Sequence, residues 1–82
     1  MILNSEGLFN GYGMVQRNVM RDPNLSIEVK GVYAYLCSFS GTGECILPDV
    51  LEQCKELGIS QNRYYKYIQI LIDNGYIEDD EE

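Results

Sequence analysis

The chain has 82 residues, with six basic and thirteen acidic side chains, no histidine, a formal net charge of -7 and a pI near 4.3. A chain of this length fits one small domain with a limited core, which leaves little room for a buried catalytic cleft. The absence of histidine removes the commonest general base and metal ligand at neutral pH. The sequence therefore predicts a non-enzymatic protein with no cofactor and no metal site.

The three cysteines, Cys37, Cys45 and Cys54, form no C-x-x-C pair, and there is no histidine to complete a zinc site. We expect each to be a small apolar side chain with a free thiol in a reducing cytosol. The first residues lack the basic region and apolar run of a signal peptide, and no window has the length of a membrane span. The prediction is a cytoplasmic protein of a bacterial or phage-infected cell, with no membrane partner.

The first part of the chain is rich in residues that interrupt regular structure, with Gly7, Gly11, Gly13 and Pro23. We expect residues 1–11 to form a flexible N-terminal segment. Residues 12–16 are predicted to be extended, and residues 17–21 to form at most one helical turn, followed by a turn at 22–24.

A stronger helical pattern begins at Ser26, which can cap a helix whose first turn carries Glu28. Between residues 27 and 39 apolar side chains recur at helical spacing, which predicts one buried face. That face consists of Val29, Val32, Tyr33, Leu36 and Cys37. Gly31 lowers the stability of the helix by about 1 kcal/mol relative to alanine, and we expect another backbone to approach it closely. Residues 44–47 are predicted to form a small strand.

Asp49 is a plausible N-cap of the next helix, with Glu52 in its first turn. Its expected buried face consists of Val50, Leu51, Cys54 and Leu57. Gly58 is expected to end this helix in the left-handed conformation after about two turns.

A third helix is predicted over residues 61–74, because Ser60 can cap its N-terminus. Ser60 follows Gly58, the expected end of the preceding helix, by only two residues. Two helices joined by such a short turn are typical of a helix-turn-helix, whose second helix enters the DNA major groove. Its apolar face is expected to dock on the other helices through Tyr64, Tyr67 or Ile68, and Leu71. Gly75 closes the helix, and residues 76–77 are predicted to begin a strand.

The opposite face of this third helix carries side chains that suit DNA recognition. Amides pair with adenine edges, arginine with guanine, and lysine or a tyrosine hydroxyl with phosphate. The candidate DNA-binding residues are Gln61, Asn62, Arg63, Tyr65, Lys66 and Gln69. A solvated helix face has the same composition, so the residues alone leave both interpretations open.

The negative charge of the chain is concentrated away from this helix. Residues 79–82 form an acidic tail, and without it the net charge is -7 + 4 = -3. No acidic residue lies between Ser60 and Ile72, where Arg63 and Lys66 are located. We therefore expect a locally positive helix on an acidic body.

Three parts of the chain resemble the winged helix-turn-helix domains of replication initiators. They are residues 12–16 with 19–22, residues 25–36, and the stretch from Leu57-Gly58-Ile59-Ser60 to Gly75-Tyr76-Ile77. These domains occur at the N-termini of phage and plasmid initiators, including DnaD-like replisome organisers. The resemblance implies a mainly α, three-helix winged helix-turn-helix with short strands over residues 12–78. Its wing is truncated or absent, because acidic residues follow Ile77.

The resemblance implies a DNA-binding module of a replication-initiation or mobile-element protein, with the third helix in the major groove of double-stranded DNA. It also implies a homodimer or a replication-protein partner. Ile70 and Ile72 flank Leu71 on the third helix, and one face cannot bury all three in an isolated domain. We expect at least one of Ile70 and Ile72 to lie in an apolar surface that another chain covers. The alternative is that the third helix has a wider buried face, which residues 3–9 cover.

A protein-interaction or oligomerisation adaptor on the same fold, with little DNA affinity, is the alternative function. It would use Ile70, Ile72 and the tyrosine-rich third helix to contact its partner, because tyrosine offers a large rigid area with a polar tip.

Overall fold

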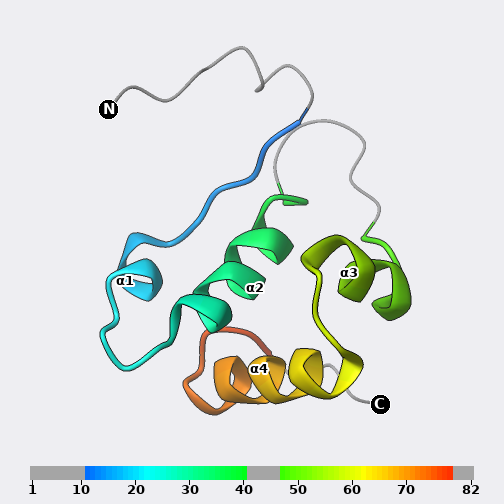
Figure 1. The fold of residues 1–82 in the computed structure, drawn as a ribbon. Helices are drawn as coiled ribbons and strands as arrows, with labels where there is room; N and C mark the ends of the chain where they lie inside the picture. Colours follow the sequence, from blue (N-terminus) through cyan, green and yellow to red (C-terminus); the bar gives the residue numbers. More distant parts are fainter. Residues whose placement is uncertain (1–10, 41–46, 79–82) are drawn as a thin grey trace.

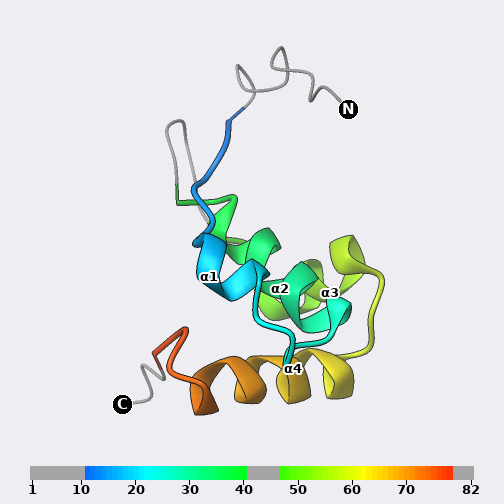
Figure 2. The same ribbon diagram turned by 90° about the vertical axis from the view of Figure 1, so that its left-hand side faces the viewer.

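The computed structural model describes residues 11–40 and 47–78, and these ranges contain four helices. They are α1 (Arg17–Met20), α2 (Ile27–Cys37), α3 (Val50–Leu57) and α4 (Gln61–Asp73). α2 and α3 both pack on α4, which runs beneath them in Figure 1. Figure 2 shows α1 on the side of α2, above the C-terminal half of α4. The mainly α-helical fold predicted from the sequence is confirmed.

Three N-caps explain where the longer helices begin. The Ser26 hydroxyl accepts a hydrogen bond from the Val29 amide at 3.2 Å, and Asp49 accepts one from the Glu52 amide at 2.9 Å. Ser60 accepts the corresponding bond at the start of α4. Each cap satisfies an amide that has no partner inside its helix, as the sequence predicts.

The core is formed where α1, α2, α3 and α4 meet, and each helix contributes to it. Its buried members are Val19, Leu25, Val29, Val32, Tyr33, Cys54, Tyr64 and Leu71. Leu36 and Cys37, which were expected in the buried face of α2, are half-buried at its edge. Both free thiols of the described residues, those of Cys37 and Cys54, are at least partly covered.

The prediction for the buried face of α3 is wrong at one position. Leu51 is 65% exposed, whereas Gln53 is only 3% exposed. Helical spacing places residue 53 on the same face as residues 50, 54 and 57, and residue 51 off that face. Gln53 is polar, but it can be buried because both ends of its amide are hydrogen-bonded there.

The expectation that a backbone approaches Gly31 closely is also wrong. A Cβ built on Gly31 would have no neighbour within 4 Å, and the residue is exposed. The close approach occurs at Gly13, where a Cβ would lie 1.7 Å from the carbonyl oxygen of Cys37. The segment before α1 therefore crosses the C-terminal end of α2 at backbone contact distance.

The strand expected to begin at residues 76–77 is not formed, and residues 12–16, which were expected to be extended, have no regular secondary structure, with Gln16 in an extended conformation. In the described ranges neither segment has a neighbouring strand to supply the ladder hydrogen bonds that a strand requires. The strand expected at residues 44–47 lies outside the described residues except for Leu47, which is irregular. Most of the N-terminal segment 1–11, the covering segment 3–9 and the acidic tail 79–82 also lie outside them.

The segment that follows α4 contacts the turn that follows α1. The Tyr76 hydroxyl donates a hydrogen bond to Asp22 Oδ2 at 2.7 Å, although the two residues are 54 positions apart. Gly75, with φ of 77°, turns the chain after α4 so that this contact can form. In the described residues, none of the helices has the length and apolar character needed to cross a membrane.

Candidate nucleic-acid interface

The turn between α3 and α4 sets the orientation of α4. Gly58 adopts the left-handed conformation with φ 73° and ψ 32°, and its amide donates to the Cys54 carbonyl at 2.8 Å. A residue with a Cβ is strained there, which explains the glycine. The chain then needs only Ile59 and the cap Ser60 before α4 begins. The predicted helix-turn-helix junction is therefore present.

One face of α4 is fixed to the rest of the domain by burial and by hydrogen bonds. Leu71 is fully buried, and Tyr64 is 6% exposed. The Tyr64 hydroxyl donates to Gln53 Oε1, and Gln53 Nε2 donates to the Pro48 carbonyl at 2.6 Å. Burial raises the pKa of the Tyr64 phenol, so the hydroxyl remains a protonated donor at neutral pH. These bonds tie α4 to α3 and to the segment that precedes α3.

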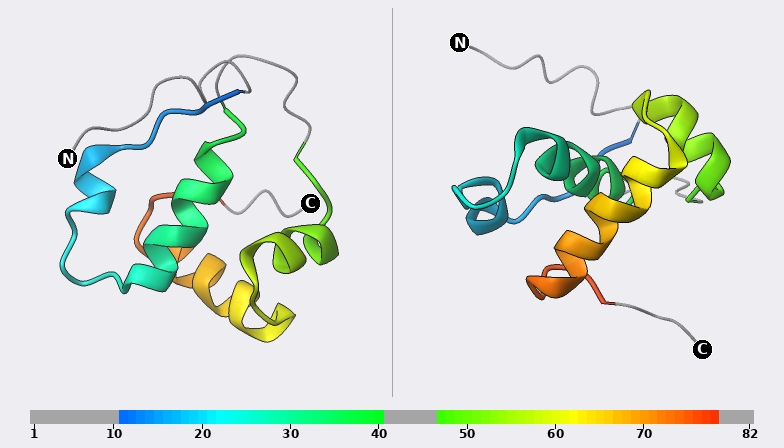
Figure 3. Two further views of the ribbon diagram at one scale, coloured as in Figure 1. Left: turned by 45° about the horizontal axis from the view of Figure 1, so that its top comes forward. Right: turned by 60° about the horizontal axis from the view of Figure 1, so that its bottom comes forward.

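The opposite face of α4 is exposed to solvent along its length. All six candidate DNA-binding residues are exposed: Gln61, Asn62, Arg63, Tyr65, Lys66 and Gln69. In the right-hand view of Figure 3, α4 lies in front of α2 and α3. The structure thus brings the predicted site residues together on one helix.

The two ends of this exposed face differ in character. Tyr65 is 54% exposed, and its ring makes an edge contact with Tyr64 at a centroid distance of 5.5 Å. Near the other end, Gln69 Nε2 donates to Asp73 Oδ1 at 2.8 Å. The positive charges and free amides therefore lie in the first half of α4, while Gln69 is already paired with an acidic neighbour.

A family model described as a helix-turn-helix domain matches residues 24–77, from the turn before α2 to the end of the segment after α4. The chain belongs to this family. No curated protein and no solved structure matches the chain. A helix-turn-helix domain is typically a DNA-binding module without enzymatic activity, and its second helix is the one that reads DNA.

A side-chain hydrogen bond between α2 and α3 also stabilises the helix-turn-helix domain. The Tyr35 hydroxyl donates to Glu56 Oε1 at 2.5 Å. Burial, followed by this bond and the charge of Glu56, raises the pKa of the Tyr35 phenol well above its ordinary value. The bond holds the C-terminal half of α3 against α2, and so supports the turn at Gly58.

The two isoleucines of the expected interface differ in their surroundings. Both are half-buried, but only Ile70 packs against the core cluster of the domain. Ile72 is also partly exposed, but it does not pack against the core cluster. Of Ile70, Leu71 and Ile72 only Leu71 is fully buried, and the expected apolar interface at Ile70 or Ile72 stays a prediction.

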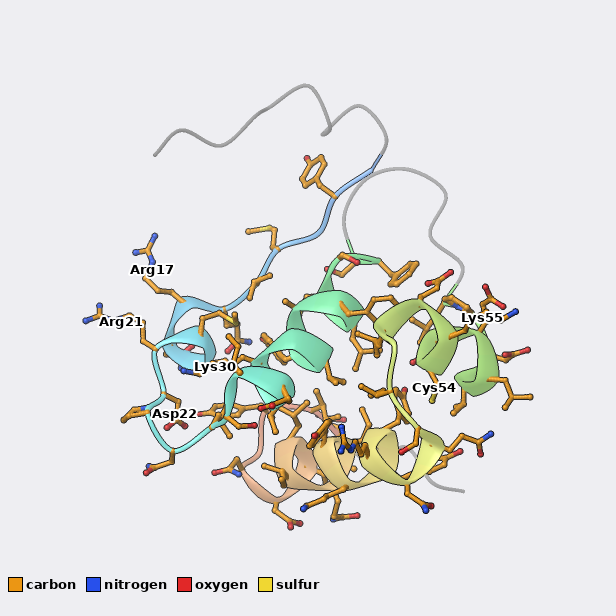
Figure 4. The ribbon with its side chains drawn as sticks, in the orientation of Figure 1. Arg17, Arg21, Asp22, Lys30, Cys54 and Lys55 are labelled. Atoms are coloured by element: carbon orange, nitrogen blue, oxygen red, sulfur yellow. The ribbon has the colours of Figure 1, made fainter. Side chains whose placement is uncertain are left out.

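Two groups of residues in the helix-turn-helix domain were not anticipated from the sequence. Gln53 positions Tyr64, and its place on the helical face of residues 50, 54 and 57 is the signal that could have revealed its burial. Arg17, Asn18 and Arg21 line an open depression on α1, and Figure 4 shows both arginines directed to the same side. Their spacing of four residues on a short helical segment is a signal that could have revealed this pair. In the described ranges no cluster of three histidine, cysteine or acidic residues could hold a metal ion.

Proposed function

We propose that this helix-turn-helix domain binds duplex DNA with α4 in the major groove, as a module of a replication-initiation or mobile-element protein. The observation that carries the proposal is the division of α4 into two faces. Tyr64 and Leu71 hold one face in the core, and the opposite face is an exposed row of amides, cations and a tyrosine. Membership of the helix-turn-helix family supports the same assignment.

The residues in the first half of α4 are the ones proposed to contact base edges. In helix-turn-helix proteins the N-terminal residues of the second helix reach the bases. Gln61 and Asn62 can pair with adenine, and Arg63 with guanine. Tyr65 and Lys66 suit the phosphate backbone, while Gln69 is held by Asp73 and is assigned a peripheral role.

The acidity of the whole chain is compatible with this proposal because the charge is unevenly distributed. α4 carries Arg63 and Lys66, and its only acidic residue is Asp73 at its last position. The neutralisation of phosphates by cations supplies most of the sequence-independent affinity for DNA. Binding is therefore expected at low salt and should weaken steeply as salt is added.

Fluorescence anisotropy with a labelled duplex at low salt tests the proposal. Arg63→Ala and Lys66→Ala should each weaken binding. Lys66→Ala, which removes one proposed phosphate contact, should also lower the salt slope by about 0.9. Lys55→Ala is the matched control, because it removes one positive charge from the exposed side of α3 without changing α4. Absence of binding at tens of micromolar protein, or equal losses in all three variants, would contradict the proposal.

The replication or mobile-element role rests on the resemblance of residues 12–77 to initiator domains. Selection of binding sites from a random-sequence DNA pool tests it separately. Preferred sites should map to a replication origin or to the ends of the mobile element that encodes the chain. Sites that instead map to promoters would support a transcriptional regulator and overturn this part of the proposal.

A second candidate function is self-association or adaptor binding through Ile72. The observation that favours it is the half-buried surface of Ile72, which does not contact the core cluster. Sedimentation at micromolar concentration should show an oligomer that Ile72→Lys converts to a monomer. Monomeric mass for both the natural chain and this variant would overturn it, whatever the DNA result.

A further inference from the structure

An asparagine followed by a glycine lies at the C-terminal end of α4. Asn74 is the C-cap of the helix, and Gly75 follows it with φ of 77°. Both residues are exposed to solvent. The Gly75 amide donates to the Ile72 carbonyl at 2.9 Å. The Tyr76 amide donates to the Leu71 carbonyl at 3.0 Å. These two bonds are those of a Schellman motif, which needs a left-handed residue and so explains the glycine.

The same pair of residues is chemically labile when the chain is unfolded. The backbone nitrogen that follows an asparagine can lose its proton to the solvent and attack the side-chain amide carbon. A glycine at this place permits the attack best, because it has no side chain to hinder the approach. The new bond closes a succinimide ring, and the side-chain nitrogen takes up a proton and leaves as ammonia. Water then opens the ring at one of its two carbonyls and gives aspartate or isoaspartate.

The fold withholds both reacting groups. The Gly75 N–H is bonded to the Ile72 carbonyl, which disfavours the loss of its proton and holds the nitrogen in the turn. Asn74 Nδ2 donates to the Ile70 carbonyl at 2.8 Å. The side-chain amide is therefore directed back along α4 and not toward the nitrogen of Gly75. The attack requires these bonds to break, which means that the end of α4 must open.

A contact beyond the pair opposes this opening. The Tyr76 hydroxyl donates to Asp22 Oδ2 at 2.7 Å, and Asp22 Oδ1 accepts from the Asn24 amide at 2.9 Å. The segment after Gly75 is thereby held to the turn that follows α1. The free energy of local opening ranges from almost nothing at a fraying end to the full free energy of unfolding, and contacts of this kind raise it.

We propose that Asn74 is a site of spontaneous deamidation, and that opening of the C-terminal end of α4 limits its rate. This modification does not depend on the proposed DNA binding. Aspartate at position 74 places a negative charge at the negative end of the helix dipole and removes the donor to the Ile70 carbonyl. Isoaspartate adds an atom to the backbone before Gly75, which disrupts the Schellman motif and shifts Tyr76 away from Asp22. Both products therefore destabilise the domain.

The experiment measures the rate of deamidation in the folded and the unfolded chain. The full chain is incubated at mildly alkaline pH, with and without urea, and is then cleaved with trypsin. Cleavage after Lys66 gives a peptide whose only asparagine is Asn74. Mass spectrometry follows the exchange of its amide for a carboxyl group, which should be about tenfold or more slower in the folded chain. The chain's other Asn-Gly pair, Asn10-Gly11, lies in a different peptide and gives the reference rate in urea.

Two pairs of variants test the cause and the consequence. Tyr76→Phe should raise the rate in the folded chain without changing the rate in urea, whereas Tyr65→Phe, which removes an exposed hydroxyl elsewhere on α4, should change neither. After incubation in urea and refolding, the natural chain should have a lower Tm than before. Asn74→Gln should keep its initial Tm through the same treatment, because glutamine closes the corresponding larger ring far more slowly.

Each part of the proposal has a result that would overturn it. If Asn74 remains intact in urea while Asn10 is converted, it is not a deamidation site. Equal rates in the folded and unfolded chain would show that opening of α4 does not limit the reaction. If Tyr76→Phe deamidates at the natural rate, the contact with Asp22 has no part in the protection. An unchanged Tm after full conversion of Asn74 would contradict the destabilising effect of the products.

Discussion

The phenol of Tyr64 on α4 donates a hydrogen bond to the amide oxygen of Gln53 on α3, and both side chains are buried. The same glutamine donates to the Pro48 carbonyl. These two hydrogen bonds, which connect Tyr64 through Gln53 to the Pro48 carbonyl, therefore fix the angle between α3 and α4. Apolar packing alone would allow more than one angle, whereas a buried polar pair is satisfied in only one arrangement.

Removal of the Tyr64 hydroxyl should destabilise the domain. In Tyr64→Phe the buried Gln53 oxygen loses its donor, which is expected to lower the free energy of unfolding by about 1–3 kcal/mol. For a domain of this size, each kcal/mol corresponds to a fall in Tm of about 4–8 °C. Tyr65→Phe, at an exposed neighbour, should leave Tm nearly unchanged. Equal Tm values for the two variants would contradict the role assigned to this bond.

The contact between Tyr76 and Asp22 should make stability depend on pH at the acidic end. The hydrogen bond from Tyr76, followed by that from the Asn24 amide, lowers the pKa of Asp22 below its ordinary value of 3.8. A carboxyl whose pKa is lowered by folding stabilises the folded state above its unfolded pKa. This stabilisation is lost as the pH falls through the folded pKa.

Tyr76→Phe removes the donor and should therefore reduce the loss of stability on acidification. Denaturant unfolding at a series of pH values from neutral to strongly acidic measures this difference. NMR titration should show the pKa of Asp22 rising toward its ordinary value in the variant. An unchanged pKa would mean that the bond does not form in solution.

Two glycines should respond in opposite ways to replacement by alanine. Gly13→Ala places a Cβ against the Cys37 carbonyl, and this overlap should lower the free energy of unfolding by about 1–3 kcal/mol. Gly31 lies exposed inside α2 with open space around it, so Gly31→Ala should raise stability by about 0.5–1 kcal/mol. Thermal unfolding of both variants checks the pair. A stabilising Gly13→Ala would show that the segment before α1 does not pack on α2.

The left-handed glycine at the helix-turn-helix turn should also be sensitive to a side chain. Gly58→Ala is expected to cost about 1–2 kcal/mol, because a Cβ is strained at φ 73°. Gly58→Asn should be milder, since asparagine tolerates this conformation. Chemical denaturation gives both values, and an alanine variant as stable as the natural chain would exclude strain at this turn.

Features that depend on residues close together in the chain could be predicted from the sequence. Ser26, Asp49 and Ser60 cap helices by bonding to amides three residues away, so sequence spacing alone identifies them. Gly58 ends α3 for an equally local reason. The exposed face of α4 followed from its helical period, and the six candidate residues do share that face.

The sequence by itself therefore determined the helices, their caps and the helix-turn-helix junction, because all of these depend on interactions within a few positions. Only the tertiary structure decided that Gln53 bonds to Tyr64, that a second backbone approaches Gly13 closely rather than Gly31, and that Tyr76 bonds to Asp22. Each of these joins elements distant in the chain, and its energy depends on geometry that no local pattern encodes.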